Sequence, residues 1–436
     1  LYAGSKDGSI AAIDIPDTTA EVDKSRYRFP KADISWRVQI EGEPWTMLAA
    51  DHKLFVVTAE GSIYCFGEKA LAQIRTQRAP ERKKSHHRWV KRARRILSDT
   101  DVREGYALVL GTGTGQLLEE IVRQSDLHVI GLDSDPENVN TLRLRFDQAG
   151  LYGDRVTILQ GSILSTPISP YLASLVVSED LKAAGYSEDN AKDFMTRVFH
   201  VLRPYGGAAC LPLNKKQQDE FLQLARAEKL PQSKVRTQGD LTVLQRVGPL
   251  RDSAPWTHHY GDVSNSIFSK DKRVKAPLGL LWFGGSSHLD VLPRHGHGPR
   301  QQVIGGRLFI QGIKVLSARD VYTGRVIWRK ELPELDTFGM YYDKSFKLDI
   351  YDRSYNQLHI PGANAWGANF VVTYDRLYLI AGQSCLVMDP ATGDTLHKWK
   401  LEEKPDIGIP NWGYIGVYKD LLIAGTAPFH IGKEDK

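Results

Sequence analysis

Three glycines at alternate positions, Gly111, Gly113 and Gly115, follow a continuous apolar run. Glycine adopts left-handed backbone angles at no steric cost, so such a turn lets a ligand approach the backbone closely. The next residues, 116–124, have the pattern of a helix, whose first N–H groups are free to bind a polar ligand. A second apolar run ends in Asp133, where a carboxylate suits the two hydroxyls of a ribose. The spacing predicts a nucleotide-type cofactor site.

Predicted strands and helices alternate around this turn. Apolar runs predict strands at 107–110, 129–132, 155–159, 172–177 and 207–211, and helical spacing predicts helices at 116–124, 136–149, 187–202 and 217–228. Ser187 is the expected N-cap of the third helix. The strands 233–238 and 241–247, joined by a Gly-Asp turn, predict a closing hairpin. This order indicates a doubly wound α/β sheet over 100–250.

Two classes of cofactor fit this arrangement. A dinucleotide-binding turn would place its third glycine at position 116, which is Gln116 in this chain. The glycines at 111, 113 and 115 instead resemble the first motif of class I S-adenosylmethionine-dependent methyltransferases. The stretch 201–207, Val-Leu-Arg-Pro-Tyr-Gly-Gly, is similar to the turn before the fifth strand of that family. The resemblance covers about 100–248 and implies a Rossmann-like methyltransferase domain.

The resemblance implies S-adenosylmethionine as the cofactor and assigns residues to it. Asp133 would bind the ribose, and the segment 161–163 after the third strand would hold the adenine. Glu179 and Asp180 follow the fourth strand beside the transferable methyl group and are candidate bases for a methyl acceptor. The alternative is that they only cap the segment after them. The implied cofactor-binding residues are Gly111, Thr112, Gly113, Gly115, Asp133, Ser134, Gly161, Ser162, Ile163 and Ser178.

The chain departs from the pattern of that family at two positions. Val109 stands where the family usually has an acid, and Ser162 stands where it often has an aspartate that contacts the adenine amino group. A neutral hydroxyl binds more weakly than a carboxylate. Cofactor binding and methyl transfer are therefore separate questions for this domain. No Asn/Asp-Pro-Pro-Tyr/Phe motif follows the fourth strand, so a nucleic-acid base is not the expected acceptor.

The flanking regions consist of short predicted strands separated by turns. The segments 6–10 and 59–63 are near copies with an acid-glycine turn, a hairpin pattern. The segments 318–328 and 387–399 each contain a strand that ends in Asp, a Thr-Gly turn and a strand with a tryptophan. In the second copy the tryptophan, Trp399, lies two residues later, which keeps it on the same face of a strand.

These repeats resemble the quinoprotein-type, or PQQ-like, β-propeller. The resemblance implies an all-β propeller interrupted by the α/β domain, which would be inserted in a loop between blades. The expected divisions are propeller blades at 1–68, a basic linker helix at 69–99, the methyltransferase-like domain at 100–250 and further blades at 251–436. The chain starts at Leu1, inside a predicted strand, so a fragment with an incomplete propeller is expected. By analogy alone, the propeller suggests a bacterial periplasmic or envelope setting.

The net charge of +5 comes from one segment, Arg75–Arg95, which has ten Lys/Arg and a single acid, Glu81. Residues 83–97 can form a helix with an apolar face, which carries Trp89, Ala93, Ile96 and Leu97. One interpretation is a surface for a protein or another acidic partner. The favoured interpretation is a solvated linker helix that packs on the methyltransferase-like domain.

Other candidate sites are weaker. Three histidines (His288, His295 and His297) lack helical spacing and a nearby acid cluster, so no metal site is expected. Three tryptophans (Trp282, Trp366 and Trp412) could stack on a quinone, but packing between blades is favoured, and PQQ is not the expected cofactor. The cysteines (Cys65, Cys210 and Cys385) are far apart without a CxxC motif and are expected to be buried thiols. No apolar run approaches the roughly 20 residues that span a bilayer.

The leading hypothesis is a methyltransferase-like domain that binds S-adenosylmethionine on a PQQ-like propeller scaffold. A second hypothesis is an interaction protein whose α/β domain has lost catalysis. A third is a quinone-dependent dehydrogenase. The methyl acceptor and the ligand of the propeller are left open.

Overall fold

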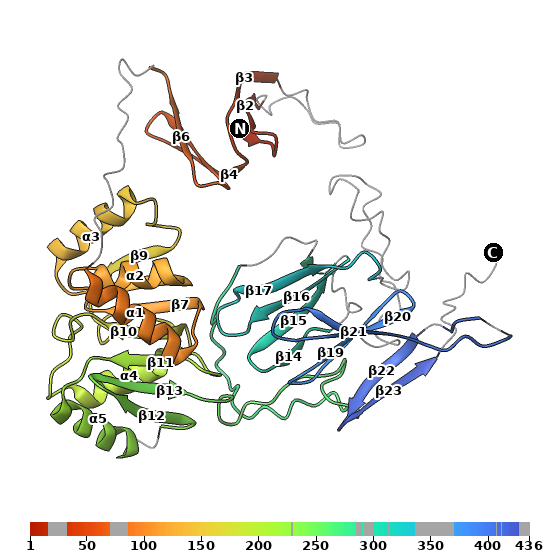
Figure 1. Cartoon of the computed structure of the whole chain (residues 1–436). Coiled ribbons are helices and arrows are strands. Elements are labelled where there is room, and N and C mark those ends of the chain that lie inside the picture. Colours follow the sequence, from red (N-terminus) through yellow and green to blue (C-terminus); the bar gives the residue numbers. More distant parts are fainter. Residues whose placement is uncertain are drawn as a thin grey trace. The chain divides into compact units, whose positions relative to one another are not determined.

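The computed structural model describes residues 1–15, 33–69, 86–227, 230–284, 290–291, 300–312, 314–335, 370–406, 408–410 and 412–426. The chain forms two compact units, Leu1–Arg78 and Ala79–Lys436 (Figure 1). Among the described residues, no helix has the length and apolar content needed to cross a membrane.

The first unit contains two antiparallel sheets of three strands each. The strands, in sheet order, are β1 (Tyr2–Gly4), β2 (Ser9–Asp14) and β3 (Asp33–Gln39), then β4 (Pro44–Ala50), β5 (Lys53–Thr58) and β6 (Ile63–Gly67). Both acid-glycine turns connect antiparallel strands, so the two predicted hairpins are confirmed. A small core of Ile10, Ile40, Leu54 and Val56 holds the unit together.

The second unit begins with an α/β domain whose seven-stranded sheet has the order β12-β13-β11-β10-β7-β8-β9. Strands β7 to β11 are parallel, and the hairpin β12-β13 adds antiparallel strands at one edge, as predicted. The strands are β7 (Glu104–Leu110), β8 (Asp126–Asp133), β9 (Val156–Gln160), β10 (Ala173–Ser178), β11 (Ala208–Leu211), β12 (Ser233–Gln238) and β13 (Leu241–Arg246). The helices are α1 (His87–Thr100), α2 (Gln116–Gln124), α3 (Pro136–Gln148), α4 (Ala191–Val201) and α5 (Lys215–Ala227).

Helices cover both faces of this sheet because its central strands are apolar on both sides. In β7, Ala107 and Val109 pack into the core under α1, α2 and α3, whereas Leu108 and Leu110 pack into the core under α4 and α5. The predicted apolar face of α1, with Trp89 among its residues, belongs to the first of these cores. The linker-helix interpretation is therefore confirmed for the packing of α1.

Helix α4 starts later than predicted. It begins at Ala191, and its N-cap residue is Asn190, so the prediction of Ser187 as the N-cap was wrong. The Asn190 side chain accepts a hydrogen bond from the Ser187 N–H (2.9 Å) and donates one to the Gly185 carbonyl (2.8 Å). These local bonds hold the preceding residues in a turn instead of a helix.

Within the described residues, the rest of the second unit contains three antiparallel sheets. Two have four strands in sequential order, and the third has two. The strands are β14 (Gln302–Ile304), β15 (Arg307–Gly312), β16 (Val315–Asp320), β17 (Val326–Glu331), β18 (Phe370–Val372), β19 (Leu377–Ala381), β20 (Ser384–Met388), β21 (Thr395–Lys400), β22 (Trp412–Tyr418) and β23 (Leu421–Thr426). The sequence repeats occupy equivalent strands of these sheets.

A tryptophan before each Thr-Gly turn packs on that turn. The indole of Trp282 donates a hydrogen bond to the Val321 carbonyl (2.9 Å), and a Cβ on Gly324 would collide with its ring. The indole of Trp328 donates to the Pro390 carbonyl (3.1 Å), and a Cβ on Gly393 would collide with its ring. Trp282 and Trp328 thus make the same contact on two Thr-Gly turns, and the packing of Trp282 between propeller blades stays a prediction.

The segment 256–258 connects the first strands of all three sheets. Trp256 exchanges two backbone hydrogen bonds with Val303, next to the start of β14. The Thr257 carbonyl accepts a hydrogen bond from the N–H of Val372 in β18 (3.3 Å). The Nε2 atom of His258 accepts one from the N–H of Val417 in β22 (3.0 Å). One extended segment therefore ties the three sheets together.

Replacing Trp328 with alanine is expected to lower the free energy of unfolding by about 3–5 kcal/mol, because the buried ring leaves a cavity against Gly393. Trp328 is 7% exposed, whereas Trp399 at the corresponding strand of the next sheet is 43% exposed. Trp399→Ala is therefore the matched control and should cost less than about 1 kcal/mol. Denaturant unfolding measures both, and equal losses would contradict the packing role of Trp328.

Stability is also expected to depend on the charge of His258. Burial lowers the pKa of His258, partly opposed by Asp262, so the ring is neutral in the folded protein. The pKa of histidine in the unfolded chain is about 6.5. The neutral His258 ring therefore makes its full contribution to the free energy of unfolding above pH 6.5, and this contribution is lost as the pH falls through the lowered pKa of the folded state. Unfolding free energies between pH 8 and pH 5 should fall more steeply for the natural chain than for His258→Gln. Parallel curves would refute this assignment.

Candidate functional site

The glycine turn lies at the carboxyl end of β7, between β8 and β10 on its two sides. In an open α/β sheet this switch point is where ligands bind. Gly111, Gly113 and Gly115 have φ angles of +62°, +52° and +73°, in the left-handed region that disfavours side chains. Gly115 is the N-cap residue of α2. The predicted strand, turn and helix are thus confirmed as structure.

Asp133, at the end of β8, is 1% exposed and anchors the turn. Its Oδ2 atom accepts hydrogen bonds from the backbone N–H (2.9 Å) and the hydroxyl (2.7 Å) of Thr112, and from Nδ2 of Asn138 (3.0 Å). Its Oδ1 atom accepts one from the N–H of Asp135 (3.0 Å). A carboxylate has about four acceptor positions, so Oδ1 can accept one more donor. Sequence reasoning missed Asn138, whose only signal is its place in the first turn of the helix after Asp133.

The other predicted binding residues lie at the same edge of the sheet. The N–H of Gly161 donates to the Asp133 carbonyl (2.8 Å), which places Ser162 and the buried Ile163 beside the end of β8. The Ser162 hydroxyl lies 3.2 Å from the Ser165 hydroxyl. Ser134 is exposed. The structure therefore brings together residues that the sequence separates into three segments.

Ser178, the last residue of β10, has a buried hydroxyl without a hydrogen-bond partner in the described part of the chain. It pairs in register with Leu110, directly before the glycine turn. A buried hydroxyl without a partner destabilises a protein, so a polar ligand at this edge would supply the hydrogen-bond partner that the Ser178 hydroxyl lacks. This orphaned group supports a ligand site here.

Both candidate bases make hydrogen bonds to the backbone. Asp180 accepts from the N–H groups of Lys182 (2.8 Å) and Ala183 (3.1 Å) and so caps the following turn. Glu179 accepts from the N–H groups of Thr114 (2.8 Å) and Leu117 (3.1 Å). The capping alternative describes Asp180 well, whereas Glu179 reaches back to the glycine turn. Their role as bases stays a prediction.

The residues at this edge fit an adenosyl cofactor in kind and in position. They provide a glycine-rich turn, a carboxylate at the end of the second strand, polar residues after the third strand and an unpartnered hydroxyl at the end of the fourth. In this structure the carboxylate of Asp133 is covered, so the edge must open to admit a ligand. The fold and the site together define a class I methyltransferase-like domain.

Comparisons with known proteins support this class. Residues 107–206 match the family model of a methyltransferase domain. The match supports S-adenosylmethionine as the cofactor of this domain. No curated protein matches the chain significantly.

The solved structures to which this chain is similar cover between 34% and 38% of it. A protein of Methanococcus maripaludis assigned to the S-adenosyl-L-methionine-dependent methyltransferases is 17% identical, with 38% of this chain and 87% of that chain covered and a TM-score of 0.33. A Galdieria sulphuraria protein assigned as a sarcosine dimethylglycine methyltransferase is 20% identical. The match covers 34% of this chain and 63% of that chain, with a TM-score of 0.29. A TehB-like SAM-dependent methyltransferase of Corynebacterium glutamicum is 18% identical. The match covers 36% of this chain and 87% of that chain, with a TM-score of 0.29. Similarity at this level carries no argument about substrate.

Other predicted sites lie partly outside the described residues, namely His288, His295, His297, Trp366 and positions 75–85 of the basic segment. Within the described ranges, no cluster of three or more His, Cys, Asp or Glu is arranged to hold a metal. Burial raises the pKa of the Cys210 thiol to about 12 and that of Cys385 to about 11. Cys65 is exposed, so the prediction of a buried thiol was wrong there, because side chains alternate along β6 and its neighbours Tyr64 and Phe66 take the side that faces the core.

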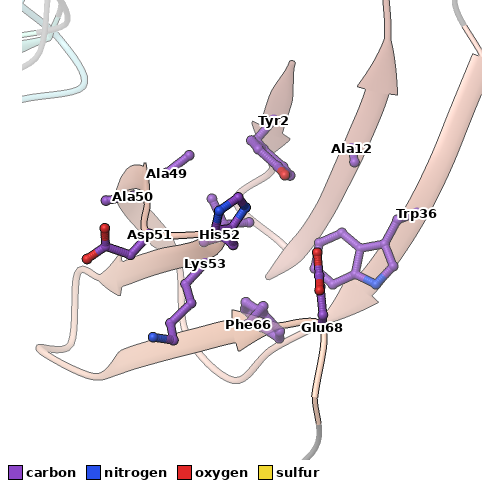
Figure 2. A pocket seen from close by; sticks show the side chains of 12 residues that line it. Tyr2, Ala12, Trp36, Ala49, Ala50, Asp51, His52, Lys53, Phe66 and Glu68 are labelled. Atoms are coloured by element: carbon purple, nitrogen blue, oxygen red, sulfur yellow. The ribbon is translucent and has the colours of Figure 1, made fainter.

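The first unit has a groove of about 710 Å³ (Figure 2). Its lining combines the rings of Tyr2, Trp36 and Phe66 with the charged side chains of Asp51 and Lys53. Sequence reasoning did not find it, because these residues come from four different strands and a turn and form no motif.

The turn before β11 ties the α/β domain to the sheet β14–β17. Arg203, from the predicted Leu-Arg-Pro turn, donates from Nε to Oδ2 of Asp320. The two side chains are only 17% and 5% exposed. The rings of Tyr171 and Tyr322 pack beside this pair, with centroids 5.6 Å apart. The aspartate of the first Thr-Gly repeat thus also binds the methyltransferase-like domain.

Asp320→Asn is expected to lower the free energy of unfolding by about 3 kcal/mol, because it leaves the charge of Arg203 buried without its partner. Asp389→Asn is the matched control: Asp389 caps the equivalent turn of the next sheet, and an asparagine oxygen can keep that cap. Thermal or denaturant unfolding compares the two variants. Equal effects would mean that only the cap matters and that the Arg203 contact adds nothing.

Proposed function

We propose that the α/β domain binds S-adenosylmethionine and transfers its methyl group to an acceptor. One observation carries this proposal: Asp133 is hydrogen-bonded to the glycine turn at the switch point of the sheet. The match of residues 107–206 to a methyltransferase domain supports it.

S-adenosylmethionine supplies a methyl group on a sulfonium that is already electrophilic, so catalysis rests mainly on alignment. The glycine turn and Asp133 would bind the cofactor and fix its orientation, and the segment 161–163 would hold the adenine. Glu179 and Asp180 are the groups placed to take a proton from an acceptor. Either must first exchange the backbone hydrogen bonds that it makes in this structure.

We also propose that the repeated sheets are blades of a PQQ-like propeller that serves as a scaffold. Two observations support this: the repeated packing of a tryptophan on a Thr-Gly turn, and the contact of segment 256–258 with β14, β18 and β22. The envelope setting and an acidic partner for the basic segment remain predictions.

A second candidate is a non-catalytic interaction protein. Val109 and Ser162 replace acids of the family pattern, and Asp133 is covered in this structure. The two candidates differ in one measurable property, the binding of the cofactor.

Isothermal titration with S-adenosylmethionine distinguishes them. The natural chain should bind, and Asp133→Asn should weaken binding by about 10- to 100-fold, because hydrogen bonds to a charged group contribute about 1.5–3 kcal/mol. Asp126→Asn, at the exposed opposite end of β8, is the matched control and should bind as the natural chain does. Circular dichroism checks that the variants fold. Absence of binding by every folded variant would favour the interaction protein.

A further inference from the structure

A single loop, residues 179–185, follows Ser178 and contacts the three other segments that were predicted to bind the cofactor. Its first residues lie on the glycine turn, where the Gly111 carbonyl accepts hydrogen bonds from the N–H groups of Glu179 (3.3 Å) and Asp180 (3.1 Å). Further along, the Ala183 carbonyl accepts one from the Ser134 hydroxyl (3.3 Å). At its end, a Cβ on Gly185 would lie 3.0 Å from Cβ of Ser162. The loop therefore covers the candidate site.

The loop packs on the turn without a gap. A Cβ on Gly111 would collide with the carbonyl oxygen of Asp180 and the N–H of Ala184, and a Cβ on Gly113 would lie 3.2 Å from Cγ of Glu179. In this structure the close approach that the glycines permit is made by the chain itself. A ligand that used these glycines would have to displace the loop.

The Glu179 side chain occupies the start of α2. Its carboxylate accepts hydrogen bonds from the N–H of Leu117 (3.1 Å) and from both the N–H (2.8 Å) and the hydroxyl of Thr114. These N–H groups have no partner within the helix, and a negative charge is stabilised at this end. The carboxylate of Glu179 thus occupies the N–H groups of the helix and the turn that would otherwise be free to bind a ligand.

The two ends of the loop are anchored, and exposed residues alternate with buried or half-buried ones between them. After the loop, Tyr186 is buried against Phe194 of α4, with ring centroids 5.3 Å apart. Before it, Ser178 is buried at the end of β10. Between them, Asp180 and Lys182 are exposed, and Gly185 has a φ of +83°. Ala184 is 1% exposed in the core under α4 and α5, and Leu181 packs against that core, so an outward movement of the loop also withdraws these two side chains.

We propose that residues 179–185 form a lid that closes the cofactor site from within, and that Glu179 is the group that holds it shut. Cofactor binding and the closed lid then exclude each other, since both use the glycine turn. This inference rests on the proposed function, because it names S-adenosylmethionine as the competing ligand. In the closed state Glu179 is a positioning residue and is not available as a base.

The test compares S-adenosylmethionine affinity by isothermal titration in the full chain with that of Glu179→Ala, Glu179→Gln and a control. Glu179→Ala should bind about tenfold tighter, since binding no longer has to break the hydrogen bonds of the carboxylate. Glu179→Gln keeps one acceptor oxygen and should gain less. Glu188→Ala removes an exposed carboxylate that pairs with Lys216 instead of the turn, so it should match the natural chain.

Amide hydrogen exchange without ligand gives a second measurement. Thr114 and Leu117 should exchange slowly in the natural chain and in Glu188→Ala, and faster in Glu179→Ala, because their acceptor is gone. Unchanged exchange in Glu179→Ala would overturn the lid.

The titration separates failure of the lid from failure of the proposed function. Equal affinity of the natural chain and Glu179→Ala, or weaker binding by Glu179→Ala, would overturn the lid and leave the function standing. Absence of binding by every variant would overturn the proposed function and, with it, the competition.

Discussion

The hydrogen bonds between Asp133 and Thr112 are the interaction on which the candidate site depends. They join the end of β8 to the turn after β7, and they hold three left-handed glycines in one arrangement at the switch point of the sheet. A buried carboxylate is tolerated only when it is hydrogen-bonded, and Asp133 receives four donors. The rigid turn then presents the start of α2 to whatever binds there.

In this structure the polar groups of the glycine turn are hydrogen-bonded by another loop of the same chain. Glu179 binds the N–H groups at the start of α2, and the Gly111 carbonyl receives two N–H groups from the same loop. The backbone N–H and C=O groups of a binding site need hydrogen-bond partners, because unpaired polar groups destabilise a protein once water is excluded. In this structure the loop after β10 meets this requirement, which links the stability of the closed domain to the free energy needed to open it.

One aspartate, Asp320, has two roles and joins the α/β domain to the neighbouring sheet. Asp320 caps the Thr-Gly turn with one oxygen and binds Arg203 with the other, whereas the carboxylate of Asp389 in the next repeat accepts a hydrogen bond from the Ala391 N–H of its own turn. The repeat is therefore a local structural device that one copy also uses for contact between domains. A tryptophan ring packs on the glycine of each such turn.

The sequence by itself determined the secondary structure of the α/β domain, the glycine turn, Asp133 and the repeated turns. These follow from local rules: apolar residues at strand or helix spacing, and glycines where only left-handed angles fit. Even the start of α4 was missed only because Asn190 competes locally with Ser187. Tertiary structure alone decided where Glu179 points, that Asn138 supports Asp133, and that Arg203 meets Asp320, 117 residues away. Such contacts depend on how separate elements pack, and no periodic pattern in the chain records which polar side chains the packing will bring together.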